Sequence, residues 1–243
     1  MARHRCVPGD RSRFVLRPAA GPVHTEALIS IAPVASTSWF GGSAQLIHPV
    51  RMTAAAGDTL TGMGWKRLAT EVMHRGPFLT LHRDTVRRPD GTAGAYEHVT
   101  VGDGVRVVAL DSDGQVLLVE DDFYLQGRRM VHLPGGGTDG ENQYRAALRE
   151  LEEETGLTAA HVDTLGVIDP LPGVTAARTH LMLVTDLRPG TMRREGTEVG
   201  MTVHWRPLSD AVAAVRAGEI TEAGSATALL LATLPHSDSP SAG

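Results

Sequence analysis

Lysine and cysteine are almost absent from this sequence of 243 residues, since Lys66 and Cys6 are the only residues of their kinds. No Gly-rich phosphate-loop pattern ends at that lysine, so a Walker A motif is excluded, and a Schiff-base lysine mechanism is not expected. A single cysteine excludes a disulfide within the chain and a CxxC metal or redox site. This scarcity of thiols favours a reducing, cytoplasmic location.

Long apolar runs and basic blocks are also missing. No run approaches the roughly 18–20 residues that a membrane-spanning helix needs, so no membrane partner is expected. The net charge is −5, and without a positive face the chain is not expected to bind nucleic acid. Aromatic residues make up only 4%, but the apolar content of 42% is enough for a globular core of Val, Leu, Ala and Met.

The pattern of the chain divides it into four segments. Residues 1–62 show no sustained period and predict a flexible extension or a start codon assigned too early, with an Arg-rich targeting peptide as the alternative. Residues 63–101 predict a β-hairpin subdomain, because alternating strand patterns flank the turn signal at 88–91. Residues 102–235 form the main domain, and the Ser/Pro-rich residues 236–243 predict a flexible tail.

The main domain has the alternating pattern of an α/β fold. Continuous apolar runs at 104–110 and 115–120 predict two strands that are buried on both faces and joined as a hairpin. Further elements are then expected in order: a helix at about 142–155, strands at 162–168, 179–185 and 201–205, and helices at about 209–217 and 221–233.

Chemistry is concentrated at residues 135–157, which read Gly-x5-Glu-x7-Arg-Glu-Leu-x-Glu-Glu-x-Gly-Leu. Glu150 and Glu154 lie four residues apart and share one face of the predicted helix, and Glu153 borders that face. Clustered carboxylates repel one another unless a cation lies between them, and hard oxygen ligands suit Mg²⁺ or Mn²⁺. A diphosphate would supply further oxygens to such an ion.

Arg149 and the glycines complete this motif. Arg149 can pair with Glu153 or reach back to Glu141, and the glycines let the backbone approach metal and phosphate closely. The alternative interpretation is a solvated Glu-rich helix face. A chance match to the whole pattern is on the order of one in a million at average residue frequencies, which favours the functional interpretation.

The motif resembles in full the box of the Nudix hydrolases. The resemblance implies an α/β/α sandwich with a mixed sheet, a divalent cation and cleavage of a nucleoside diphosphate linked to another moiety. It also implies metal ligands at Glu150, Glu153 and Glu154, with the backbone carbonyl of Gly135 as a further ligand. Glu141 and Arg149 are implied to organise the loop and the helix.

Flanking segments resemble the ADP-ribose pyrophosphatase branch over about 65–235. They are the hairpin at 84–91, the loop and strand at 172–181, and the pattern at 203–221. In that branch the hairpin commonly mediates a dimer, so a homodimer is implied. The chain departs from the branch at 121–123, where a Gln-aromatic-Arg stretch is usual, at His132 and at 176–177.

The branch resemblance implies ADP-ribose as a substrate, but these departures favour a related dinucleotide or nucleotide sugar over ADP-ribose itself. Arg128, Arg129 and Arg178 are then candidate phosphate contacts, with surface arginines as the alternative interpretation. Glu198 resembles the position of the catalytic base in the branch, offset by one residue, and Glu195 is the second candidate. If neither serves, Glu150 or Glu153 could activate water directly.

The sequence therefore predicts a Mg²⁺-dependent Nudix pyrophosphatase that releases a nucleoside monophosphate such as AMP and a phosphorylated product. Two other functions stay open. One is a Nudix-fold sensor that binds a nucleotide without cleaving it, and the other is a house-cleaning nucleoside triphosphatase.

Overall fold

The protein is represented by a computed structural model that describes residues 64–194, 196 and 200–235. The expectations for residues 1–62 and for the tail 236–243 lie outside this range, as do Glu195 and Glu198. In the part of the chain that the structure describes, no helix is long and apolar enough to cross a membrane.

The first described residues form a three-stranded antiparallel sheet in the order β1-β2-β3. Its strands are β1 (Lys66–Arg75), β2 (Thr80–Arg87) and β3 (Ala93–Thr100). The predicted hairpin is β2–β3, and Gly91 with a φ of 84° makes the turn between the two strands. The third strand, β1, was not predicted, because none of its ten residues is fully buried and its polar and apolar residues do not alternate regularly.

Two further three-stranded sheets make up the main domain. In the order β4-β8-β7, β4 (Gly104–Ala109) runs parallel to β8 (Thr179–Pro189), which pairs antiparallel with β7 (Leu157–Ile168). In the order β6-β5-β9, β5 (Gln115–Phe123) pairs antiparallel with both β6 (Arg128–His132) and β9 (Thr202–Pro207). The strands expected at 162–168, 179–185 and 201–205 correspond to β7, β8 and β9.

The hairpin predicted between 104–110 and 115–120 is wrong in its pairing. Both strands exist as β4 and β5, but only the isolated bridge Leu110↔Val116 joins them. The reason is that both edges of β5 are occupied by β6 and β9. One edge of β4 pairs with β8, and the Gly-rich segment 134–137 accepts further hydrogen bonds from β4.

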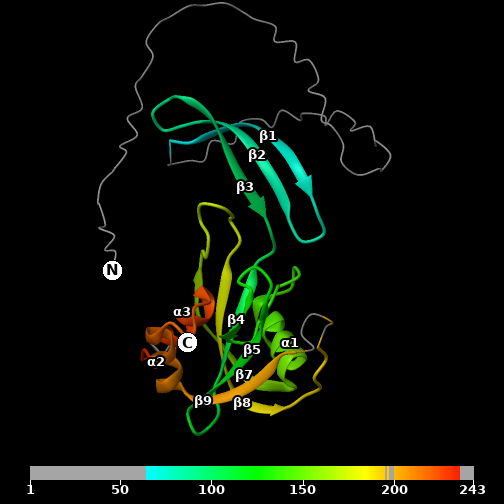
Figure 1. The fold of residues 1–243 in the computed structure, drawn as a ribbon, viewed down its shortest axis with the longest axis vertical. Helices are drawn as coiled ribbons and strands as arrows, with labels where there is room; N and C mark the ends of the chain where they lie inside the picture. Colours follow the sequence, from blue (N-terminus) through cyan, green and yellow to red (C-terminus); the bar gives the residue numbers. More distant parts are fainter. Residues whose placement is uncertain (1–63, 195, 197–199, 236–243) are drawn as a thin grey trace, which may run out of the picture. The chain divides into compact units, whose positions relative to one another are not determined.

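Helices cover both faces of these strands (Figure 1). The helix α1 (Gln143–Thr155) packs with Val107 and Leu117 on one side. The helices α2 (Leu208–Ala217) and α3 (Ala223–Leu231) pack with Val108 and Val116 on the other side. Neighbouring residues of one strand thus enter opposite cores, which explains the continuous apolar runs and confirms the predicted α/β/α arrangement.

Helix α1 has well-defined ends. Asn142 caps its first turn, since its side-chain oxygen accepts the Tyr144 N–H at 2.9 Å. Gly156 ends the helix in the left-handed region, with a φ of 72° and its N–H bonded to the Glu152 carbonyl. The buried face of α1 carries Ala147 and Leu151 but also Glu150 and Glu154, and these two carboxylates lead directly to the candidate site.

Candidate active site

The Gly-rich loop lies against strand β4. Val107 N–H donates to the Pro134 carbonyl and Val105 N–H to the Gly136 carbonyl, both at 2.9 Å. Gly135 has a φ of 143°, and a Cβ there would lie 2.2 Å from the Val105 carbonyl oxygen, so only glycine fits. The loop is therefore held in a backbone conformation that brings it close to α1.

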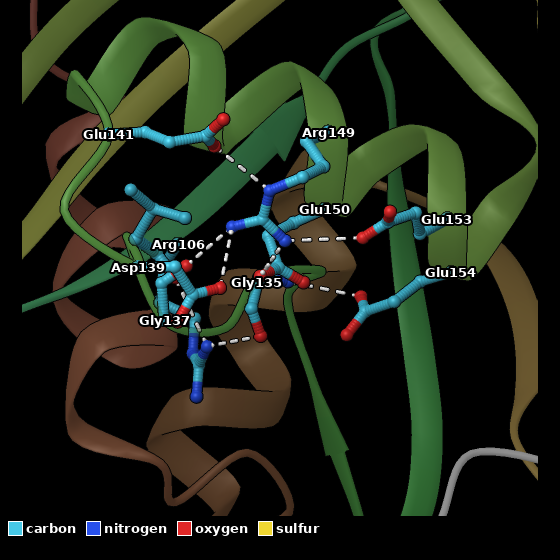
Figure 2. A network of polar contacts seen from close by, with 10 residues as sticks. Arg106, Gly135, Gly137, Asp139, Glu141, Arg149, Glu150, Glu153 and Glu154 are labelled. Carbon is cyan, nitrogen blue, oxygen red and sulfur yellow. Dashed lines mark hydrogen bonds and ion pairs between the residues drawn. The ribbon is translucent and has the colours of Figure 1, made fainter. Parts of the chain in front are cut away.

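Two of the three motif carboxylates reach this loop from α1. Glu150 and Glu154 are 7% and 3% exposed. Glu154 accepts the Gly135 N–H at 3.0 Å (Figure 2). Glu150 lies against Gly136, where a Cβ would stand only 2.7 Å from its Oε1. Glu153 is more exposed and borders the same face.

Arg149 ties the loop and the carboxylates together (Figure 2). Its Nη1 donates to Glu150 at 2.8 Å and to Glu153 at 3.2 Å, and its Nε donates to Glu141 at 3.0 Å. Its Nη2 donates to the Gly137 carbonyl at 2.8 Å and to Asp139 at 3.3 Å. Partial burial opposes its charge, but the pairs with Glu141, Glu150 and Glu153 outweigh this and raise the pKa of the guanidinium.

The donors fit a hard divalent cation in type. Carboxylates are the ligands that Mg²⁺ and Mn²⁺ prefer, and Glu150, Glu153 and Glu154 would hold the ion. In the structure these carboxylates are turned toward Arg149 and the Gly135 N–H, and within the described residues no three acidic or histidine side chains gather at one point.

The expected backbone ligand has a cationic neighbour. The Gly135 carbonyl accepts a hydrogen bond from Arg106 Nη1 at 2.6 Å (Figure 2). A carbonyl oxygen carries two lone pairs, so this bond leaves one for another partner. Arg106 was not among the residues singled out from the sequence.

The three candidate phosphate-binding arginines lie elsewhere. Arg128 donates to Thr221 Oγ1 at 2.9 Å, and Arg129 donates to the Glu120 carbonyl at 2.9 Å. Arg178 is exposed, with its Nε 3.8 Å from Asp169. None of these contacts is to the acidic motif, so a role of these arginines in binding phosphate stays a prediction.

A second feature is a cavity of about 310 Å³ beside the N-terminal sheet. Trp65 and Tyr96 stand edge to face at 5.8 Å in its wall, and Tyr96 donates to the Gly173 carbonyl at 2.9 Å. Asp84 also lines the cavity, is 7% exposed and pairs with His98 at 3.2 Å. Its Oδ1 is buried and has no hydrogen-bond partner among the residues described.

Sequence reasoning missed Arg106, Glu222, Asp84 and His98. Arg106 could have been found from the sequence, because it interrupts the apolar run of β4 and a buried charge needs a partner. That partner is Glu222, at 3.1 Å. No local pattern marked Asp84 and His98, because their pairing depends on the register of β2 and β3.

Known protein families and relatives match both the N-terminal sheet and the main domain of this chain. The NUDIX domain model matches residues 100–224, and the nucleoside diphosphate sugar hydrolase N-terminal domain matches residues 65–99. The ADP-ribose pyrophosphatase of Mycobacterium tuberculosis is 35% identical over 159 residues, which cover 64% of this chain and 77% of the relative. The ADP-ribose pyrophosphatase of Bacillus subtilis is 31% identical over 166 residues, covering 68% and 90%.

A solved structure described as an ADP compounds hydrolase has the same fold. It superposes with a TM-score of 0.60 at 21% sequence identity, covering 67% of this chain and 89% of that chain. The family match spans the acidic motif, the Gly-rich loop and the helices α1 and α2, which lie on opposite faces of the strands. The chain therefore belongs to the Nudix hydrolases, in their ADP-ribose pyrophosphatase-like branch.

Proposed function

We propose that the protein is a Mg²⁺- or Mn²⁺-dependent pyrophosphatase acting on a nucleoside diphosphate linked to another moiety. ADP-ribose, an NAD-like dinucleotide and a nucleotide sugar are the candidate substrates. The observation that carries the proposal is the pair of buried carboxylates, Glu150 and Glu154, held against the Gly-rich loop with Arg149 beside them. The similarity to two ADP-ribose pyrophosphatases supports it.

The residues would divide the work as follows. Glu150, Glu153 and Glu154 hold the cation, which when bound neutralises charge on the diphosphate and acidifies water. Water attacks one phosphorus, the bridging P–O bond breaks, and a nucleoside monophosphate leaves together with a phosphorylated product. Glu198 takes the proton of the water, with Glu195 as the second candidate and Glu150 or Glu153 as the direct alternatives. Arg149 keeps the carboxylates in place.

The cavity beside β1–β3 suits the base of the nucleoside. Aromatic side chains such as Trp65 and Tyr96 in its wall offer flat apolar surface on which a base can pack. Arg128, Arg129 and Arg178 remain candidates for the phosphates. We also propose that the protein is cytoplasmic and forms a homodimer. A molar-mass measurement on the full chain would test the homodimer.

A substrate panel tests the reaction. Purified full-length protein with Mg²⁺ or Mn²⁺ is incubated with ADP-ribose, dinucleotides, nucleotide sugars and dGTP, and the products are separated by chromatography. We expect AMP or another monophosphate from a diphosphate-linked substrate, and little from dGTP. A preference for dGTP would favour the house-cleaning triphosphatase, and tight binding without any product would favour the sensor. No monophosphate from any member of the panel would contradict the proposal.

A matched pair of variants ties the reaction to this site. Glu154→Gln removes one metal-binding carboxylate and its charge, so turnover should fall by about 10²-fold or more. Glu219→Gln changes an exposed glutamate that pairs with Arg206, and it should keep wild-type turnover.

A further inference from the structure

Arg106 connects the Gly-rich loop to a helix outside the motif. Its side chain is 17% exposed within the apolar strand β4. Nη1 donates to the Gly135 carbonyl at 2.6 Å and to the Val105 carbonyl at 3.1 Å, while Nε donates to Glu222 at 3.1 Å. The planar guanidinium can point two donors in fixed directions, which a lysine cannot do.

Glu222 is itself held rigidly as the N-cap of α3. Its carboxylate accepts the Gly224 N–H at 3.0 Å, the Ser225 N–H at 2.6 Å and the Ser225 hydroxyl at 2.7 Å. Burial opposes the charge of Glu222, but Arg106 and the bonds from Ser225 outweigh it and lower the pKa to about 2. The carboxylate therefore stays ionised and offers Arg106 a permanent partner.

Ser225 closes the contacts into a ring. It is fully buried, and its Oγ accepts the Leu133 N–H at 2.9 Å while donating to Glu222. The ring runs from Leu133 through Ser225, Glu222 and Arg106 to the Gly135 carbonyl. Both ends of the Leu133–Gly135 turn are therefore hydrogen-bonded to this ring, Leu133 through its backbone N–H and Gly135 through its backbone carbonyl.

This grip matters because Gly135 stands at the candidate metal site. Its N–H binds Glu154, its carbonyl binds Arg106, and its φ of 143° lies in a region that residues with a Cβ rarely adopt. Without a fixed partner, the freedom of glycine would let the carbonyl turn away. The hydrogen bond from Arg106, which is itself held by Glu222 at the start of α3, restricts the rotation of this carbonyl.

We propose that Arg106, held by Glu222 and Ser225, is a positioning residue that orients the Leu133–Gly135 turn and so sets the affinity of the acidic site for its divalent cation. This inference rests on the proposed metal-dependent function. It adds the start of α3, a region outside the acidic motif, to the parts of the chain that determine cation binding.

Binding of Mn²⁺ to the full-length protein, followed by the loss of the free-ion electron paramagnetic resonance signal, tests this without substrate. Arg106→Met should weaken Mn²⁺ binding by about tenfold or more, as losses of groups that orient metal ligands commonly do. Arg206→Met, which removes only the exposed pair with Glu219, is the matched control and should bind as the wild type does. Wild-type affinity in a folded Arg106→Met protein would overturn the proposal.

A second variant keeps the test decisive if Arg106→Met does not fold. Glu222→Gln keeps one acceptor oxygen for the α3 N–H groups but loses the second oxygen and the charge that holds Arg106, so it should also weaken Mn²⁺ binding. Folding of this variant is checked by thermal melting. Wild-type affinity in a folded Glu222→Gln protein would equally overturn the proposal.

If Arg106→Met folds, the double variant Arg106→Met/Glu222→Gln tests whether the two residues act together. Its affinity for Mn²⁺ should be no lower than that of Arg106→Met alone, and additive losses would contradict a shared role.

Turnover separates positioning from general damage. In the variants the Mn²⁺ concentration for half-maximal activity should rise, while the KM for substrate at saturating Mn²⁺ stays near the wild-type value. A variant that lowers kcat alone, with unchanged Mn²⁺ dependence, would indicate a merely structural role and contradict the inference. If the wild type itself binds no Mn²⁺, the proposed function fails, which is distinguishable from a failure at Arg106.

Discussion

Arg149 shows at the scale of one residue how the candidate site is held. It contacts the carboxylates of Glu141, Glu150, Glu153 and Asp139, together with the Gly137 carbonyl. Four carboxylates at this density repel one another, and a single guanidinium with five N–H donors offsets that repulsion in a fixed geometry. The motif thus includes its own internal cation.

The variant Arg149→Lys keeps the charge but loses the fork of donors. A lysine ammonium cannot reach Glu141, Glu150 and the Gly137 carbonyl together, so we expect kcat to fall by roughly 10- to 100-fold. Steady-state kinetics beside the control Arg206→Lys will measure this. Equal kcat in the two variants would refute the organising role of Arg149.

Gly136 gives a second prediction at this scale. A Cβ at this position would lie 2.7 Å from Glu150 Oε1 and 2.9 Å from its Oε2, so Gly136→Ala must displace this carboxylate. A misplacement of about 1 Å at a reacting centre can cost on the order of 10²-fold in rate, and we expect a loss of that size. Gly102→Ala is the control, since a Cβ there meets nothing within 4 Å. Similar turnover in both proteins would speak against close contact between Glu150 and the loop.

At the scale of elements, local patterns were sufficient for some parts and not for others. Helix α1 was predictable because the residues of its apolar face, its N-terminal cap Asn142 and its C-terminal Gly156 all lie within one short segment of the sequence. The strands β4 and β5 were predictable as buried, but their partners were not, because β8 and β9 come much later in the chain. Strand β6 was missed because its Arg-Arg-Met-Val-His sequence is short and mixed in polarity.

Two ionisable groups, Glu222 at the start of α3 and His132 at the end of β6, make the stability of the fold depend on pH. Glu222 has its pKa lowered to about 2 by Arg106 and Ser225, against the ordinary 4.5, despite burial. Its stabilisation is present above pH 4.5 and is lost as the pH falls toward 2. Burial and Arg106 lower the pKa of His132, so stability also declines as the pH falls below its ordinary 6.5. Both groups act in the same direction.

Urea unfolding between pH 7 and pH 3 measures this dependence. The free energy of unfolding should fall as the pH is lowered, and Glu222 accounts for about 2 kcal/mol of the fall between pH 7 and pH 3. In Glu222→Gln the fall below pH 4.5 should be smaller than in the wild type. An identical pH profile in the two proteins would show that Glu222 is not stabilised in its ionised form.

At the scale of the whole molecule, the candidate site combines nearby and distant parts of the chain. Glu141, Arg149, Glu150, Glu153 and Glu154 were predictable because they belong to one motif. Arg106 lies 29 residues before Gly135 and 116 before Glu222, so only the folded chain brings these three together. The grouping of the motif side chains was therefore predictable, whereas the support behind their loop was not.

The most direct test of the account is to follow hydrolysis of ADP-ribose, an NAD-like dinucleotide and a nucleotide sugar in ¹⁸O-labelled water by mass spectrometry, with Mg²⁺ and with wild-type or Glu154→Gln protein. The account predicts that wild-type protein converts at least one of them to a nucleoside monophosphate and a phosphorylated product, that one of the two products carries a single ¹⁸O in its phosphate, and that Glu154→Gln forms little of either. Absence of products from all three substrates with wild-type protein, or equal amounts from the two proteins, would contradict it.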